Sequence, residues 1–236
     1  MANFLALETS TDACSMALLH EGEITERHEV IPRQHSQRLF GMLAELLPHG
    51  RLREQGVDAV VYGVGPGSFT GLRICASAVQ GLCFANDLPA VPVSTLLAQT
   101  YTALRQGAVR PGDWVLSTLD ANIGELYWSV YRVSGSAVEV LEGPRVGRPQ
   151  ALTLPSGDVP VTGIGSGLNY LDQLPRLIRD RLQLTVPELL PHARDLFAPA
   201  ELATQAGHLQ SAEQVCPLYV RDEISWKKLS EQGKSN

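Results

Sequence analysis

The stretch Gly65-Pro66-Gly67-Ser68-Phe69-Thr70-Gly71 lies between an apolar run at 57–62 and a helical pattern at 72–85. The apolar run predicts a buried strand, so the motif joins a strand to a helix. Its glycines permit backbone angles that are closed to other residues, and they let the helix N-terminus approach an anion or another backbone. The Gly-Lys-Ser/Thr ending of a Walker A loop is absent. Tight packing and ligand binding both remain open as its purpose.

The second half of the chain repeats this arrangement. A short strand at 159–162 precedes the motif Gly163-Ile164-Gly165-Ser166-Gly167, and a helical pattern follows from 168 to about 182. Upstream of each glycine loop, a strand ends on a carboxylate, Glu8 or Asp120, and two further strands follow. A unit used twice predicts an α/β chain with a duplicated actin/hexokinase-like (ASKHA) fold. Each lobe would be a mixed sheet flanked by helices, and the two acids would face the cleft between the lobes.

The connection around 105–112 contains glycine and proline and sets the expected lobe boundary. We predict an N-terminal lobe over 1–106, a C-terminal lobe over 107–215 and a C-terminal segment over 216–236. The last residues of that segment are polar, and we expect them to be disordered.

Composition narrows the class of protein. With 44% hydrophobic and 19% charged residues, the 236-residue chain can build a proper core. A net charge of −6 argues against a protein that grips RNA phosphates by itself. The four cysteines form no CxxC motif, so we expect core thiols in a reducing compartment. We see neither a signal peptide nor a membrane span, and therefore expect a cytoplasmic protein with no membrane partner.

Five motifs, in order, resemble successive signatures of the TsaB family of bacterial tRNA threonylcarbamoyladenosine biosynthesis proteins. They run from about Leu5 to Lys228 and read LALETSTDACSMAL, PRQHSQ, GPGSFTGLRI, LDANIGELYW and PLYVRDEISWKK. The resemblance implies a non-catalytic scaffold subunit that binds and activates the catalytic paralogue TsaD, where ATP and metal are expected. It also implies an ATPase partner, TsaE, a homodimer when the protein is alone, and contact with tRNA only through the complex.

The chain departs from the family pattern around the cleft. Glu8 stands where Asp is usual, Val64 where Arg is common, Cys75 where Gly is usual and Asn122 where Arg is usual. These departures weaken any claim that the cleft binds nucleotide. We therefore expect no catalytic residue and no cofactor of its own, and a vestigial cleft that comprises Glu8, Thr9, Gly65, Gly67 and Asp120.

The two acids leave a rival function open. Glu8 and Asp120 would suit Mg²⁺ in an independent ATP-dependent kinase or transferase that uses the inter-lobe cleft. Alternatively, each side chain bonds backbone N–H groups of its own hairpin turn, which the lack of lysine near either glycine loop favours. The six histidines form no HxxxH or HExxH pair, so we expect no metal site and disfavour a metalloprotease.

The helices beside the first glycine loop indicate a partner surface. Apolar residues of the pattern at 37–47 cover roughly 200° of the helix, whereas a surface helix needs about 100°. The helix at 72–85 carries a line of small residues that would let another helix approach closely, and Thr70 is its expected N-cap. Packing within the chain is the alternative explanation. The expected interface residues are Leu39, Leu43, Leu46, Ile74, Ala78 and Gly81. A C-terminal trio, Trp226-Lys227-Lys228, is either an RNA contact or a docked helix end.

Overall fold

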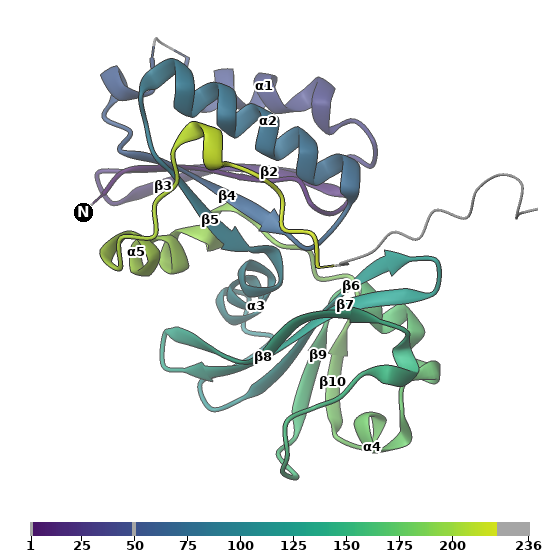
Figure 1. Cartoon of the computed structure of the whole chain (residues 1–236). Helices are drawn as coiled ribbons and strands as arrows, with labels where there is room; N and C mark the ends of the chain where they lie inside the picture. The colour runs from purple at the N-terminus through teal and green to yellow at the C-terminus, as the bar shows by residue number, and fades with distance from the viewer. Residues whose placement is uncertain (1, 49–50, 221–236) are drawn as a thin grey trace, which may run out of the picture.

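The computed structural model describes residues 2–48 and 51–220, so the Trp226-Lys227-Lys228 trio and the end of the tail lie outside the described residues. Two five-stranded sheets form two lobes (Figure 1). The first sheet contains β1 (Phe4–Glu8), β2 (Ala13–His20), β3 (Glu23–Val30), β4 (Ala59–Gly65) and β5 (Ala90–Ser94). The second contains β6 (Trp114–Asn122), β7 (Glu125–Ser134), β8 (Ala137–Gly147), β9 (Val161–Ile164) and β10 (Leu182–Val186).

The two sheets have the same topology. Their strand orders are β3-β2-β1-β4-β5 and β8-β7-β6-β9-β10. In each sheet the first strand pairs antiparallel with the second and parallel with the fourth. This repeat confirms the predicted α/β fold of the duplicated ASKHA type.

Alternation along the strands builds a core on each side of the first sheet. One side carries Leu5, Leu7 and Met16 and packs against α1 (His35–Leu46) and α2 (Phe69–Asn86). The other carries Phe4 and Ala6 and packs against α3 (Thr95–Arg105) and α5 (Phe197–Gln205). Helix α3 also contributes to the core of the second sheet, so it lies between the lobes (Figure 1).

The second lobe lacks the long helix predicted from 168 to 182. The chain instead forms a 3₁₀ segment at Ser166–Gln173, the short α4 (Arg176–Arg179) and then β10. Pro175 explains the difference, because a proline disfavours helical backbone in the residue before it. Leu174 is indeed extended, with φ −67° and ψ 149°. The remaining 3₁₀ segments are Arg53–Gln55, Pro149–Ala151, Ala193–Leu196 and Ala212–Gln214.

The chain returns to the first lobe after β10. Ala193, Leu196 and Phe197 enter the core on the side of the first sheet that also packs against α3. Gln210 then bridges to Ala90 of β5, and the Gln80 side chain of α2 donates to the carbonyl of Val215 at 2.8 Å. Residues 193–215, which we assigned to the second lobe, thus cover the first one, because its sheet has two apolar faces to bury.

Two sequence expectations concern the chain as a whole. Cys14, Cys75 and Cys83 are buried free thiols as expected, whereas Cys216 is exposed and the prediction for it is wrong. Within the described residues, no helix combines the length and the apolar character that crossing a bilayer requires.

Candidate functional site

The acid at the end of β1 is enclosed by protein. Glu8 has no exposed surface, and its Oε1 accepts from the Ser10 N–H at 2.7 Å while its Oε2 accepts from the Thr95 hydroxyl at 3.1 Å. Burial raises the pKa of Glu8, against the lowering effect of these hydrogen bonds. A Cβ at Gly63 would collide with the Glu8 carboxylate, so the absence of a side chain at Gly63 leaves the space that this carboxylate occupies.

The first glycine loop packs directly on the β1–β2 hairpin. The Ser68 N–H donates to the Ser10 carbonyl at 2.7 Å, and the Thr9 hydroxyl donates to the Gly71 carbonyl at 2.8 Å. A Cβ at Gly67 would stand 2.5 Å from the Ser10 oxygen, and one at Gly71 would collide with the Thr9 oxygen. Hairpin backbone therefore occupies the space beside the loop, which supports tight packing as the purpose of these glycines.

The loop also sets where α2 begins. Gly65 has φ +115°, which L side chains rarely adopt. Ser68 is the N-cap residue, and its hydroxyl accepts from the Gly71 N–H at 3.3 Å. The prediction of Thr70 as N-cap is wrong by two residues, because α2 already begins at Phe69.

The second lobe repeats the contacts of the acid. Asp120 Oδ1 accepts from the Asn122 N–H at 2.8 Å and from the Tyr170 hydroxyl at 3.2 Å. Glu8 and Asp120 thus accept the same hydrogen bond, which the backbone N–H two residues later in the chain donates to each carboxylate. The predicted alternative, in which each acid bonds its own hairpin turn, is confirmed. The two acids belong to separate hydrogen-bond networks, and Asp120 is only half-buried.

The second glycine loop repeats the packing. A Cβ at Gly167 would stand 2.7 Å from the Thr118 Cβ, and one at Gly165, where φ is +88°, would collide with the Thr118 carbonyl. The Thr118 hydroxyl donates to the Ile164 carbonyl at 2.8 Å, and the Asp120 N–H donates to the Ser166 hydroxyl at 3.0 Å. Both loops therefore lie against the hairpin of their own lobe.

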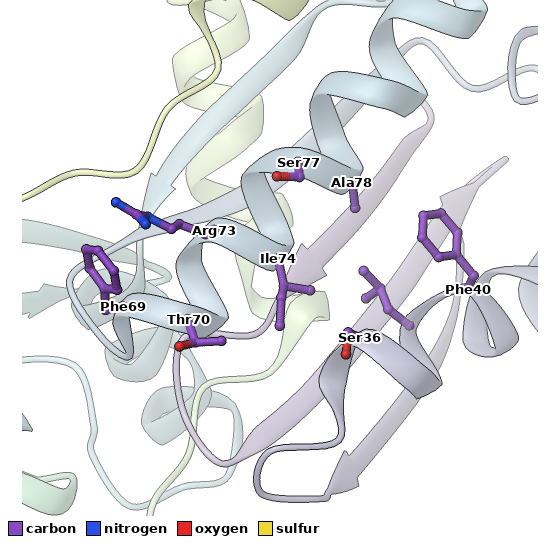
Figure 2. A pocket seen from close by; sticks show the side chains of 9 residues that line it. Ser36, Phe40, Phe69, Thr70, Arg73, Ile74, Ser77 and Ala78 are labelled. Carbon is purple, nitrogen blue, oxygen red and sulfur yellow. The ribbon is translucent and has the colours of Figure 1, made fainter.

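An open apolar groove runs between α1 and α2 (Figure 2). Its volume is about 600 Å³, and Phe40 and Phe69 on its rim are 59% and 48% exposed. The Arg73 guanidinium lies over the Phe69 ring, 3.7 Å from the centroid, and gives the rim one cation. The other lining residues are Ser36, Leu39, Thr70, Ile74, Ser77 and Ala78. A second hollow of about 400 Å³ lies towards the C-terminal ends of both helices and includes Leu43, Leu47, Leu82 and Ala85.

The expected interface residues divide between this surface and the core. Ile74 and Ala78 line the groove, and Leu43 lines the second hollow. Gly81 faces open space, since a Cβ there would meet no atom within 4 Å. Leu39, 1% exposed, forms the floor of the groove, and Leu46 packs into the core of its own lobe instead of facing outward.

Phe40 and Phe69, which are exposed on the rim of the groove, are not among the interface residues expected from the sequence. Phe40 belongs to the wide apolar arc of the first helix, so the signal was present, but we chose leucines on the inner part of that arc. Phe69 lies within the glycine motif, and the helical pattern at 72–85 places it before the helix, whereas α2 begins at Phe69.

Comparisons with known proteins agree with the fold. The family model described as "TsaD: tRNA N6-adenosine threonylcarbamoyltransferase" matches residues 23–173. The TsaB protein of Escherichia coli K12 is 35% identical, covering 95% of this chain and 97% of that protein. The TsaB protein of Haemophilus influenzae is 34% identical over 95% of this chain and 96% of its own. Among solved structures, YeaZ from Pseudomonas aeruginosa has a TM-score of 0.83 and 38% identity, covering 93% of this chain and 100% of that one.

Proposed function

This chain belongs to the TsaB family of tRNA threonylcarbamoyladenosine biosynthesis proteins, and from that premise we propose that it is a non-catalytic subunit. It holds and activates a TsaD-like catalytic paralogue while a threonylcarbamoyl group is transferred to the adenosine beside the tRNA anticodon. ATP and the catalytic metal belong to the paralogue. The observation that carries this proposal is the packing of both glycine loops against their own hairpins.

An independent ATP-dependent kinase would need room for phosphates beside these loops. The Ser68 N–H is already bonded to the Ser10 carbonyl, and Glu8 is fully buried, so neither offers a free contact to a nucleotide. We expect a calorimetric titration of the purified chain with ATP-Mg²⁺ to give no binding heat. Micromolar binding that Asp120→Asn abolishes would instead favour the kinase.

The α1–α2 groove supports the partner-binding part of the proposal. It exposes two aromatic rings and a cation, and Gly81 leaves space for a close helix approach. Buried aromatic anchors account for much of the energy of protein interfaces. We propose that the same groove forms the homodimer when the protein is alone. A patch buried against its own copy is unavailable to another subunit, so the TsaD-like paralogue competes with the homodimer.

Sedimentation velocity with and without the paralogue tests the groove. Phe40→Glu places a charge on its rim, and Gly81→Leu adds bulk where backbones should approach. Each should weaken both associations by about tenfold or more while leaving the melting temperature of the monomer nearly unchanged. Leu177→Glu is the matched control, because Leu177 is 80% exposed but belongs to α4 of the other lobe. Normal dimers and normal complexes from folded groove variants would contradict the proposal.

The remaining partners follow from the family and from charge. We propose a TsaE-like ATPase as a further subunit, a cytoplasmic location, and tRNA contact through the complex only, since the chain carries a net charge of −6. Filter binding should detect no tRNA on the chain alone and retention once the paralogue is present. Tight binding by the chain alone would contradict this.

A further inference from the structure

Three potential metal ligands meet where the returning chain crosses the first sheet. Glu26 and His28 lie two residues apart on β3 and therefore point to the same face of the strand. His192 comes from the segment just before the 3₁₀ turn at Ala193–Leu196. The rings of His28 and His192 stack with centroids 3.7 Å apart, and His192 Nδ1 lies 3.2 Å from Glu26 Oε2. One ligand atom from each residue lies within 4.8 Å of the other two.

We propose that Glu26, His28 and His192 bind a divalent transition-metal ion of the Zn²⁺ type. Two imidazoles and one carboxylate form a donor set that zinc accepts in proteins, with a fourth position left for water. Imidazole ligands select zinc and its first-row neighbours over Mg²⁺ and Ca²⁺, which prefer oxygen donors alone.

The surroundings prepare these side chains as ligands. His28 Nδ1 is buried and has no hydrogen-bond partner among the described residues, so it is a nitrogen with an unused lone pair or proton. Glu26 Oε1 accepts from the Ser15 hydroxyl at 3.2 Å and from the Arg194 N–H at 3.3 Å, which fixes the carboxylate from behind.

Binding requires a small local rearrangement. Zinc–nitrogen and zinc–oxygen bonds of about 2.1 Å in a tetrahedron place ligand atoms roughly 3.4 Å apart. The three ligand atoms must therefore converge, and the two imidazoles must tilt out of their parallel stack. All three residues keep part of their surface exposed to solvent.

The site would join two distant parts of the chain. Glu26 and His192 are 166 residues apart in sequence, and one belongs to β3 while the other belongs to the segment that returns from the second lobe. An ion held between them would clasp that segment to the first sheet. The expectation of no metal site rested on histidine pairs at helical spacing, which cannot detect ligands from a strand and a distant loop. We replace that expectation here.

Metal titration of the full chain tests this inference. The protein is purified without a polyhistidine tag, stripped with chelator and titrated calorimetrically with ZnCl₂, and CoCl₂ provides a visible spectrum of the coordination. We expect one ion per chain, the absorption of four-coordinate Co²⁺, and a Zn²⁺-dependent rise in melting temperature.

Substitutions at the ligands make the test specific. His192→Ala and Glu26→Gln should each lower the affinity by about tenfold or more and abolish the cobalt spectrum. Glu26→Gln keeps an acceptor for Ser15 and Arg194, so it should fold even if His192→Ala does not. His208→Ala, at an exposed histidine elsewhere on the same lobe, should bind as the wild type does. Substoichiometric binding, or binding that survives in folded Glu26→Gln protein, would overturn the proposal.

Discussion

The two glycine loops begin alike and end differently. Each follows the fourth strand of its sheet, and each packs through glycine on its own hairpin. The first continues into the 18-residue helix α2, whereas the second continues into a 3₁₀ segment that ends at Gln173, two residues before Pro175. The two lobes share the contact between the glycine loop and the hairpin. They differ in the segment that follows the loop and in the surface that this segment forms. Only the first lobe presents the α1–α2 groove.

The largest effect is expected from adding a side chain to a glycine at the contact that both loops share. Gly71→Ala and Gly67→Val each place a Cβ closer to hairpin backbone than real Cβ atoms come. We expect each to lower the free energy of unfolding by about 3 kcal/mol or more, as for severe overpacking. Gly167→Ala should have a similar cost, because the second loop is packed in the same way. Urea unfolding would measure all three.

Gly81→Ala is the control for these substitutions. Gly81 lies on α2, as Gly71 does, but an added Cβ there meets no atom within 4 Å. Because alanine favours helix over glycine, this change should stabilise the monomer by up to about 1 kcal/mol. If Gly71→Ala unfolds at the same urea concentration as Gly81→Ala, the loop is not packed as described.

A smaller effect is expected for Ser68 and Ser166, the serines of the two glycine loops, and it should differ between them. Ser68 caps α2, and Ser166 accepts from the Asp120 N–H. Ser68→Ala should destabilise the protein by about 1 kcal/mol and increase hydrogen exchange in the first turn of α2. Ser166→Ala should leave the exchange in α2 unchanged, because its bond supports the other hairpin. Equal exchange in both variants would remove this distinction between the loops.

The smallest expected effect concerns Glu8 and Asp120 and is a dependence of the free energy of unfolding on pH. The pKa of Glu8 is raised above its ordinary value of 4.5 by burial, so the folded state holds this proton more tightly than the unfolded state does. The protonated Glu8 therefore stabilises the folded state at low pH, and this contribution is lost as the pH rises above 4.5 and through the raised pKa of the folded state. Glu8→Gln should remove the slope and leave the protein at neutral pH as stable as the wild type or more so.

Urea unfolding between about pH 5 and 8 would measure the slope. Asp120→Asn is the matched control, because Asp120 makes the same turn bond but is half-buried. A marked loss of stability in Glu8→Gln at neutral pH would show that the charged carboxylate is the form the fold requires.

Local patterns predicted the duplicated architecture, because alternating strands and glycine loops are encoded within short segments. The strands expected at 14–19, 24–30 and 125–133 lie within one or two residues of β2, β3 and β7. Pro175 was a local signal that we overlooked. The return of 193–215 to the first lobe was not predictable in this way, because it depends on which sheet face lacks a cover.

In the candidate site, too, the features encoded in short segments were predictable and those that depend on tertiary packing were not. The turn bonds of Glu8 and Asp120 are local and were anticipated as one alternative. Phe40 is exposed and Leu39 is buried because of how α1 is rotated about its axis against the sheet. The apolar surface of this helix is so wide that the sequence alone is compatible with several such rotations. The meeting of His28 with His192 depends on tertiary structure alone.

The return of the chain has a consequence during synthesis on the ribosome. The first sheet is complete once β5 has emerged, but α5, which covers Phe4, Ala6 and Val61, is translated only after the whole second sheet. Until then, only α3 packs on that apolar face of the nascent first lobe, and the part that α5 covers later stays open to chaperones or to misassociation. A fragment that ends at residue 106 should therefore aggregate, while the same fragment supplied with a peptide spanning 190–215 should remain in solution.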